Sequence, residues 1–600
     1  MSIKNFFKGM FTTVGVLMVL LTAAAVIVAL VYVKEEGPGI PEKVILEANF
    51  EKGIVEYVPG DAVIGMLQER RATVRDTIEA IELASRDSRV LGLVARIGAA
   101  NMGLGRIQEL RDAVSSFRKA GKPAVAYAHT FGEFGPGNGA YYLATAFEQI
   151  YIQPSGDVGL TGLMYRSPFV LGALEKLGIT PRMDHRGQYK TAMNTFTERG
   201  FTEAHRESVV SMMQSHFSQL TKGIAEGRGI PEDEVRAIID RGPFSAEEAL
   251  HAKLVDGLAY RDEVYDKMKE RAGAEAQFLA LNKYGQRVRD EDDSEGETVA
   301  LIYGVGNVQR GKSGSSPMSD SSMGADTLVA AFRSAIEDKD VRAILFRVDS
   351  PGGSYVASDT IWRETTRARK AHKPIVVSMG DLAASGGYFV SAAADKIVAQ
   401  PGTLTGSIGV FAGKPILSEL WEKIGVSWGE AHTSKHAGFW SENQDYSPEE
   451  WAQFQGWLDR VYKDFTSKVA EGRKLPLEKV LEIAQGRVWT GEEAKALGLV
   501  DALGGFPEAL RLAKQEAGIS PEAKIRLKLF PRKKKLLESL KEKLWAEEDD
   551  DAEDDDISVM MAHALELARP FALFMKDVGS SRGARILTMP EAGAVRDLRE

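Results

Sequence analysis

The chain has 600 residues and a net charge of −10, and its 44% hydrophobic and 27% charged residues are typical of globular proteins. A chain of this length is expected to form two or more domains. The acidic balance, with no clustered face of Lys and Arg, argues against a nucleic-acid binder, and the lack of cysteine excludes disulfides and thiolate nucleophiles.

The first feature in chain order is a run of 24 uncharged residues, 10–33. As a helix this run would be about 36 Å long, enough to cross a hydrocarbon core of about 30 Å. A cleaved signal peptide is the alternative, but its apolar region usually has only about 7 to 15 residues. Since the run is longer than that and no convincing cleavage site follows it, we expect an uncleaved transmembrane helix. Lys4 and Lys8 precede the run, which weakly favours an orientation with residues 1–9 in the cytoplasm and the body of the chain outside.

Most of the remaining chain consists of two degenerate copies of one unit, about 44–256 and about 299–501. Residues 89–98 align with residues 340–349 at an offset of 251, and after an apparent insertion at 131–134 the offset becomes 247. A unit of this length is far too long for a solenoid repeat. The chain is therefore expected to hold two domains of one fold.

Within each copy, apolar runs alternate with helical stretches, as in residues 343–348, 354–371 and 375–378. This rhythm predicts α/β domains with substantially parallel sheets. The expected organisation is a first domain at 40–285, a linker at 286–297, a second domain at 298–515, and a carboxy-terminal extension at 516–600 that contains an acidic run.

Ser385 lies where a strand is expected to pass into a helix. The strand should end near Ser378, a tight turn should cover 380–384, and the helix should begin around Gly386. The free N–H groups at a helix amino terminus favour a developing oxyanion. The Ala-Ser-Gly-Gly-Tyr motif around Ser385 also leaves the backbone uncovered, so that a peptide carbonyl could approach closely.

A second turn of this kind, residues 349–353, also follows a strand and precedes a helix. It could supply another N–H donor, from Gly352 or Gly353, beside the one from Gly386. The first copy has Asn138 opposite Ser385 and lacks the Pro-Gly-Gly sequence of this turn. Only the second copy has this hydroxyl together with two N–H donors. Acyl transfer explains this combination better than close packing alone.

A serine hydroxyl needs a base to become a good nucleophile. No histidine lies near Ser385 in the sequence, and His372 would be at the far end of its strand. The nine histidines also lack metal-site spacing, and His432 and His436 have the look of ordinary surface or packing residues. A lysine can serve if burial lowers its pKa from about 10.4 to about 7 or 8.

Over roughly residues 40–510 the chain resembles the long, duplicated form of the signal peptide peptidase A family. These are bacterial membrane-bound serine proteases that use a Ser/Lys dyad. The resemblance is carried by the motif around Ser385, by Gly-Gln-Tyr-Lys-Thr-Ala around Lys190, and by Thr-Gly-Ser-Ile-Gly around Ser407. It implies that Ser385 is the nucleophile, Lys190 the general base, and Ser407 a residue that orients the lysine amine.

The resemblance further implies two tandem ClpP/crotonase-like domains and an endopeptidase that degrades cleaved signal peptides and other short hydrophobic or unfolded peptides. The expected oxyanion donors are Gly353 and Gly386. The expected location is the bacterial inner membrane, as a single-pass protein with its catalytic domains on the periplasmic side. A homo-oligomer, with a tetramer favoured, is expected, and no cofactor, metal or nucleic acid.

Two other functions remain open at this point. Acyl-CoA hydratases and isomerases share the fold and use paired oxyanion donors, but they act on thioesters through carboxylates and lack both the Ser/Lys pair and a membrane anchor. A catalytically inactive membrane scaffold built on the same fold is the other alternative, because a fold alone does not establish an activity.

Overall fold

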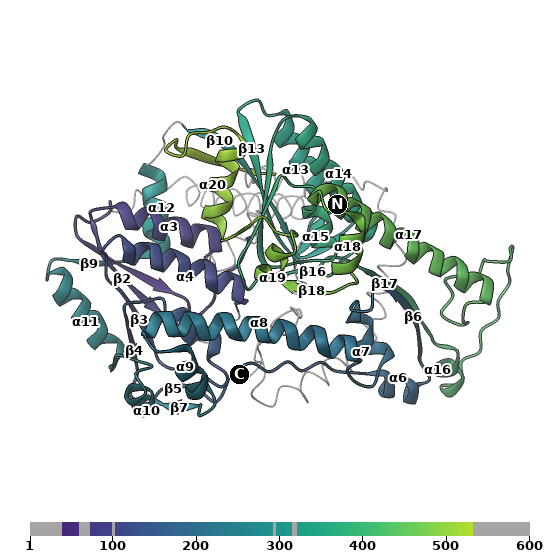
Figure 1. The fold of residues 1–600 in the computed structure, drawn as a ribbon, viewed down its shortest axis with the longest axis horizontal. Coiled ribbons are helices and arrows are strands. Elements are labelled where there is room, and N and C mark those ends of the chain that lie inside the picture. The colour runs from purple at the N-terminus through teal and green to yellow at the C-terminus, as the bar shows by residue number, and fades with distance from the viewer. Residues whose placement is uncertain (1–38, 59–71, 99–101, 292–295, 315–320, 532–600) are drawn as a thin grey trace, which may run out of the picture.

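Two largely parallel sheets organise the chain, one from each copy of the repeat (Figure 1). The computed structural model describes residues 39–58, 72–98, 102–291, 296–314 and 321–531. The run at 10–33, where a membrane span is expected, and residues 532–600 of the expected extension lie outside this part of the chain. Among the helices that are described, none is long and apolar enough to cross a membrane.

The first sheet has the strand order β8-β4-β3-β2-β1-β9, and all neighbouring strands are parallel. Its central strands are apolar on both faces because helices cover both. Leu93 faces the larger core with α3, α4 and α5, whereas Val94 faces α11. The elements are β1 (Val44–Asn49), α3 (Val74–Arg86), β2 (Val90–Arg96), α4 (Leu104–Lys119), β3 (Ala124–Ala128), α5 (Asn138–Ala144), β4 (Gln149–Ile152), β8 (Gly257–Leu258), α11 (Arg261–Ala272), β9 (Gln277–Ala280) and α12 (Leu281–Glu291).

The second sheet has the order β18-β16-β14-β13-β10-β20, with β15 joining β14 to β19. Phe346 faces the core with α13, α14 and α15, and Leu345 faces α20 on the other side. The elements are β10 (Glu297–Val305), α13 (Ala325–Glu337), β13 (Val341–Ser350), α14 (Tyr355–Lys370), β14 (Ile375–Ala384), α15 (Gly386–Ser391), β15 (Lys396–Ala399), β16 (Leu404–Gly406), β18 (Val488–Thr490), α19 (Gly491–Ala496), β19 (Ala502–Leu503), α20 (Phe506–Glu516) and β20 (Ile525–Phe530).

The duplication recurs in individual hydrogen bonds. In the first copy the buried hydroxyl of Tyr141 donates to the carbonyl oxygen of Leu254, at 2.7 Å. In the second copy the buried hydroxyl of Tyr388 donates to the carbonyl oxygen of Leu499, at 2.9 Å. Two sheets with matching strand order and matching buried contacts are tandem domains of one α/β fold.

The ends of the two domains differ in detail from the expected ranges. Helix α12 runs to Glu291 and so occupies part of the expected linker, and β20 joins the second sheet beyond residue 515. Strand β9 is an edge strand that pairs with β1 in the first sheet, and β20 is an edge strand that pairs with β10 in the second. Each sheet is therefore completed by a strand that follows the end of its copy.

Strand β14 is longer than the sequence suggests. It continues to Ala384 instead of ending near Ser378, because its pairing with β13 shifts register after Val348. Beyond the shift, residues Leu382 to Ala384 pair with β16. The segment expected to be a tight turn is thus extended, and the strand delivers its end directly to the amino terminus of α15.

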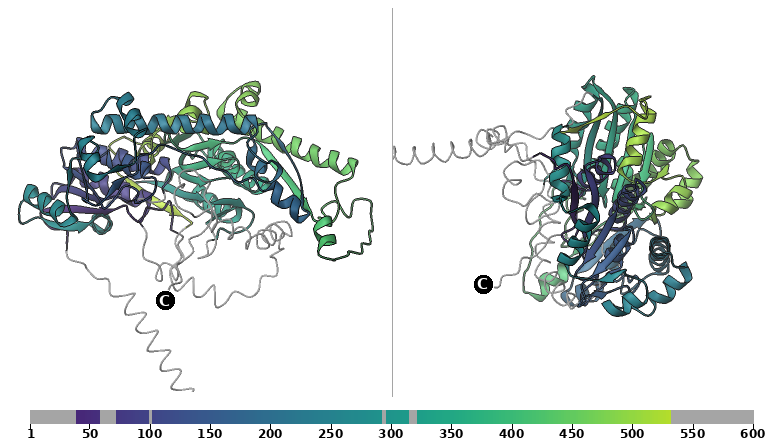
Figure 2. Two further views of the ribbon diagram at one scale, coloured as in Figure 1. Left: turned by 90° about the horizontal axis from the view of Figure 1, so that it is seen from below. Right: turned by 90° about the vertical axis from the view of Figure 1, so that its left-hand side faces the viewer.

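A long helix and a pair of antiparallel strands are among the features that join the domains. The long helix α8 (Glu203–Arg228) crosses from the first sheet to the second, as Figures 1 and 2 show, and there the Ser215 hydroxyl contacts that of Thr490 at 2.9 Å. Strand β6 (Thr180–Arg186) of the first copy pairs antiparallel with β17 (Val410–Ile416) of the second. The remaining elements are β5 (Asp157–Val158), α6 (Leu171–Leu177), η1 (Thr191–Met193), α7 (Asn194–Thr197), α9 (Glu232–Ile239), β7 (Phe244–Ser245), α10 (Ala246–His251), β11 (Asn307–Gln309), β12 (Ser322–Gly324), α16 (Ser418–Lys423), α17 (Pro448–Arg473) and α18 (Leu477–Ile483).

Candidate active site

Ser385 lies between the end of β14 and the first residue of α15. Its backbone has φ of 53° and ψ of −118°, a conformation that non-glycine residues adopt only when their surroundings enforce it. The Ser385 N–H donates to the carbonyl oxygen of Gly406, at 2.9 Å, which ties it to β16. The strained turn thus presents the hydroxyl beside the free N–H groups of α15.

Lys190 comes from the other copy, in the segment between β6 and η1. Its Nζ lies 2.9 Å from the Ser385 Oγ, 2.8 Å from the carbonyl oxygen of Ser407 and 3.0 Å from the Ser407 Oγ. A neutral amine has two N–H bonds and one lone pair. If the two N–H bonds point to the oxygens of Ser407, the lone pair is left for the Ser385 hydroxyl proton.

The amine is almost completely withdrawn from solvent, because only 4% of the Lys190 surface is exposed. Burial disfavours the charged form, and it lowers the pKa of Lys190 from 10.5 to about 7. The side chain can therefore be neutral near physiological pH. A neutral amine in hydrogen-bond contact with a serine hydroxyl has the properties of a general base.

Ser407 directly follows β16, with φ of 50°. Its N–H donates to the carbonyl oxygen of Arg487, at 2.7 Å. Both oxygens of Ser407 face the Lys190 amine, so this residue fixes the direction of the lone pair. Three residues predicted from the sequence, Ser385, Lys190 and Ser407, are thus brought together from the two copies.

The turn of residues 350–353 packs against the amino terminus of α15. A Cβ atom placed on Gly352 would lie 2.5 Å from the Gly386 N, and one placed on Gly386 would lie 3.1 Å from the Gly353 N. The Gly352 N–H donates to the Ser350 Oγ, at 3.2 Å. Among the described residues neither the Gly353 nor the Gly386 N–H has a hydrogen-bond partner, so these two donors next to Ser385 are available to a ligand.

The equivalent position in the first copy is closed. Asn138 is fully buried, and its Oδ1 accepts from the N–H groups of Thr161 and Gly162, both at 3.1 Å. Its Nδ2 donates to the Gly162 carbonyl oxygen, at 2.8 Å. With its amide satisfied by backbone groups and no hydroxyl present, this position holds no nucleophile.

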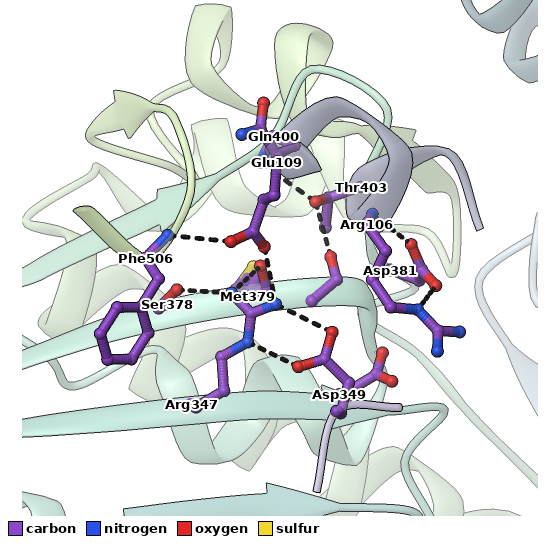
Figure 3. Close-up of polar contacts among 12 residues, drawn as sticks. Arg106, Glu109, Arg347, Asp349, Ser378, Met379, Asp381, Gln400, Thr403 and Phe506 are labelled. Atoms are coloured by element: carbon purple, nitrogen blue, oxygen red, sulfur yellow. Dashed lines mark hydrogen bonds and ion pairs between the residues drawn. The ribbon is translucent and has the colours of Figure 1, made fainter. Parts of the chain in front are cut away.

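A buried ionic cluster joins the two copies (Figure 3). Arg347, on β13, is 1% exposed, and its guanidinium contacts Glu56 at 2.8 Å and Glu109 at 2.6 Å, both from the first copy. Burial raises the pKa of Glu109. These contacts are not among those predicted from the sequence, although an arginine within the apolar strand 343–348 indicates a buried partner.

The cluster extends to the strands that lead to the turn of residues 350–353 and to Ser385. Asp381, on β14, accepts from the backbone N–H of Arg106 at 2.7 Å and from that of Gly103 at 3.0 Å. The Asp349 carboxylate accepts from the Leu382 N–H, at 3.0 Å, and burial together with nearby Glu56 raises the pKa of Asp349. Loss of these contacts would loosen both β13 and β14 just before their functional ends.

The residues described by the structure contain no group of three His, Asp or Glu side chains that could hold a metal ion. His432 lies 3.0 Å from the carboxylate of Glu430, and His436 lies 3.3 Å from that of Glu450. Each of these two histidines is therefore paired with a glutamate.

Several known proteins are similar to this chain. The model of peptidase family S49 matches the chain twice, at residues 116–275 and 367–520. Over 457 residues, 74% of this chain, the sequence is 35% identical to Protease 4 of Salmonella typhi, covering 72% of that protein. Over 457 residues it is also 34% identical to the chloroplastic serine protease SPPA of Arabidopsis thaliana, covering 66%, just under two thirds, of that protein. A solved structure of a ClpP1 mutant from Listeria monocytogenes is 13% identical, covers 35% of this chain and 94% of its own, and has a TM-score of 0.22.

Proposed function

This chain belongs to peptidase family S49 and is a serine peptidase, and from that premise we propose that it is an endopeptidase with Ser385 as nucleophile and Lys190 as general base. The observation that carries the proposal is the 2.9 Å contact between the Lys190 Nζ and the Ser385 Oγ at a site withdrawn from solvent. A positively charged neighbour is not needed to favour the neutral amine, since burial by itself lowers the pKa of Lys190 to about 7.

In the acylation step the Ser385 Oγ attacks the carbonyl carbon of the peptide bond, and its proton passes to the Lys190 Nζ. The oxygens of Ser407 hold the resulting ammonium, while the N–H groups of Gly353 and Gly386 stabilise the negative oxygen. The C–N bond then breaks and the ammonium returns its proton to the leaving amine. A water molecule, deprotonated by the lysine, hydrolyses the ester on Ser385 and restores the hydroxyl.

We propose cleaved signal peptides and other short hydrophobic or unfolded peptides as substrates, as the family resemblance implies. An extended peptide could place a carbonyl oxygen at the N–H groups of Gly353 and Gly386, which have no hydrogen-bond partner among the described residues. The proposal includes a membrane anchor at 10–33, catalytic domains on the outer side and assembly into a homotetramer. Cell fractionation with and without residues 1–33, and light scattering of the detergent-solubilised full chain, test the last three points.

Hydrolysis of a fluorogenic peptide by the wild type, Ser385→Ala and Lys190→Ala tests the chemistry. Removing the nucleophile or its base should lower kcat by a factor on the order of 10⁴ or more, with folding preserved in circular dichroism. Activity retained in both variants would refute the Ser/Lys assignment. Turnover of an acyl-CoA thioester would instead favour a hydratase or isomerase, and lack of any hydrolysis by the wild type would favour a scaffold.

A further inference from the structure

One segment of the second copy, residues 484–489, lies between the lysine and its orienting serine. The Tyr189 N–H, directly before Lys190, donates to the carbonyl oxygen of Gln485, at 2.8 Å. On the other side, the Ser407 N–H donates to the carbonyl oxygen of Arg487, at 2.7 Å. The same short segment is thus hydrogen-bonded to both groups that determine where the amine points.

Gly486 brings this segment into direct contact with the lysine backbone. Its φ is +75°, and a Cβ atom there would lie 2.5 Å from both the N and the Cβ of Lys190. The Gly486 N–H also donates to the carbonyl oxygen of Ile408, at 2.8 Å. The close approach leaves no room for water behind the lysine, which agrees with the burial of its amine.

The Arg487 side chain adds a second connection to the first copy. Its Nη1 donates to Glu207 Oε1 at 2.6 Å, and Glu207 Oε2 accepts from the Tyr189 hydroxyl at 2.8 Å. The guanidinium carbon lies 4.9 Å from the centre of the Tyr189 ring and 4.5 Å from that of Trp489. One arginine therefore holds Tyr189 by stacking and, through the carboxylate of α8, by hydrogen bonding.

We propose that Arg487 is a positioning residue that holds Lys190 and Ser407 together across the two copies, through its carbonyl group on one side and the Glu207–Tyr189 pair on the other. This role rests on the proposed Ser/Lys function. A surface ion pair that only stabilised the fold would lower the amount of active enzyme. Loss of a positioning residue would instead change the pKa of the Lys190 amine.

The two roles predict different pH profiles. The proposed base works only when neutral, so kcat should rise with pH as the Lys190 amine loses its proton. If loss of the Arg487 contact lets water reach the amine, the charged form is favoured and the rise moves to higher pH. Activity would then fall near neutral pH and recover at alkaline pH, with little change in KM.

The experiment measures kcat and KM against pH for the full-length chain and for Arg487→Met, Glu207→Gln and Tyr189→Phe. Arg487→Met should move the rise of kcat by about one pH unit to higher pH, which is about a tenfold loss below the rise. Tyr189→Phe keeps the ring and the fold, so it tests the connection if Arg487→Met proves unstable. The double variant Glu207→Arg with Arg487→Glu should recover part of the shift.

Lys479→Met is the matched control, because Lys479 and Glu482 form an exposed ion pair on the neighbouring helix α18, at 3.1 Å. It should leave the profile unchanged. A loss of activity by the same factor at every pH in Arg487→Met and Tyr189→Phe would overturn the positioning role while leaving the Ser/Lys function intact. Failure of that function itself shows separately, as activity retained without Ser385 or Lys190.

Discussion

Lys190 owes its lowered pKa to its surroundings and not to a charged neighbour. Its contacts with Ser407 are to neutral oxygens. These oxygens accept hydrogen bonds from the amine, but they stabilise its positive charge less than a carboxylate would. Such a site keeps the lysine basic enough to accept a proton and neutral enough to do so near pH 7. Burial of the neutral amine lowers the stability of the folded protein, because in the unfolded chain the same amine would be charged and hydrated.

This cost can be measured as a dependence of stability on pH. The pKa of Lys190 is about 7 in the folded protein and 10.5 in the unfolded chain, so unfolding takes up a proton between these values. The free energy of unfolding of the wild type should therefore rise with pH across this window. Lys190→Met, which fills the site without an amine, should be more stable than the wild type at pH 7, by about 2 to 4 kcal/mol.

The stability difference should shrink as the pH approaches 10, and chemical denaturation at several pH values measures it. Lys479→Met is again the control, since that side chain is half-exposed and its loss should change stability by less than about 0.5 kcal/mol at every pH. A Lys190→Met variant less stable than the wild type at pH 7 would show that the amine is not kept neutral by burial.

At the scale of elements, the positions of the turn of residues 350–353 and of Ser385 are set by how two strands end. Strand β13 passes into the turn of residues 350–353, and β14 passes into α15 after its register shift. Val308, on β11, holds the turn from outside, because its N–H donates to the Gly352 carbonyl oxygen and its carbonyl oxygen accepts from the Ser354 N–H, both at 2.8 Å. The turn has little freedom to move.

Gly353→Ala tests this arrangement. A Cβ atom there would lie 2.2 Å from the Val308 carbonyl oxygen, and φ is +149°, so the turn must shift and its N–H must move with it. We expect kcat to fall by a factor of roughly 10² to 10³, the typical cost of losing one oxyanion donor. Gly429→Ala, where no atom lies within 4 Å of the added methyl group, should leave kcat unchanged.

The sequence predicts the elements well because each copy repeats the same alternation, and differences between the copies single out Ser385. It does not predict which strand ends meet. The longer β14 depends on pairing with β16, and the availability of Gly353 in place of Gly352 depends on the Ser350 hydroxyl. Contacts of this kind join residues whose spacing carries no regular pattern, so periodicity cannot reveal them.

At the scale of the whole molecule, the copies are joined through buried charge. Arg347 is read from the sequence as one more strand residue, yet it meets Glu56 and Glu109 from the other copy, 291 and 238 residues away. A buried ion pair has a large desolvation cost, so its main effect appears when one partner is lost. The cluster therefore requires one specific arrangement of the two domains.

Arg347→Met should destabilise the protein by about 3 to 5 kcal/mol, because it leaves two buried carboxylates without their cation. Thermal or chemical denaturation measures the loss, and replacing Glu56 and Glu109 by Leu in the same chain should restore much of it. Arg342→Met is the control on the same strand, since Arg342 is half-exposed and pairs with Glu297 at 3.1 Å. Equal effects of the two arginine substitutions would contradict a special role for the cluster.

The separation of Lys190 and Ser385 by 195 residues has a consequence for biosynthesis. A growing polypeptide that has folded only its first half contains Lys190, the proposed base, but not yet Ser385, the proposed nucleophile, which is translated later. Proteolytic competence then arises only when synthesis is nearly complete and both halves have docked. A site that needs groups from both copies can therefore form only after each copy has folded and the two have packed together.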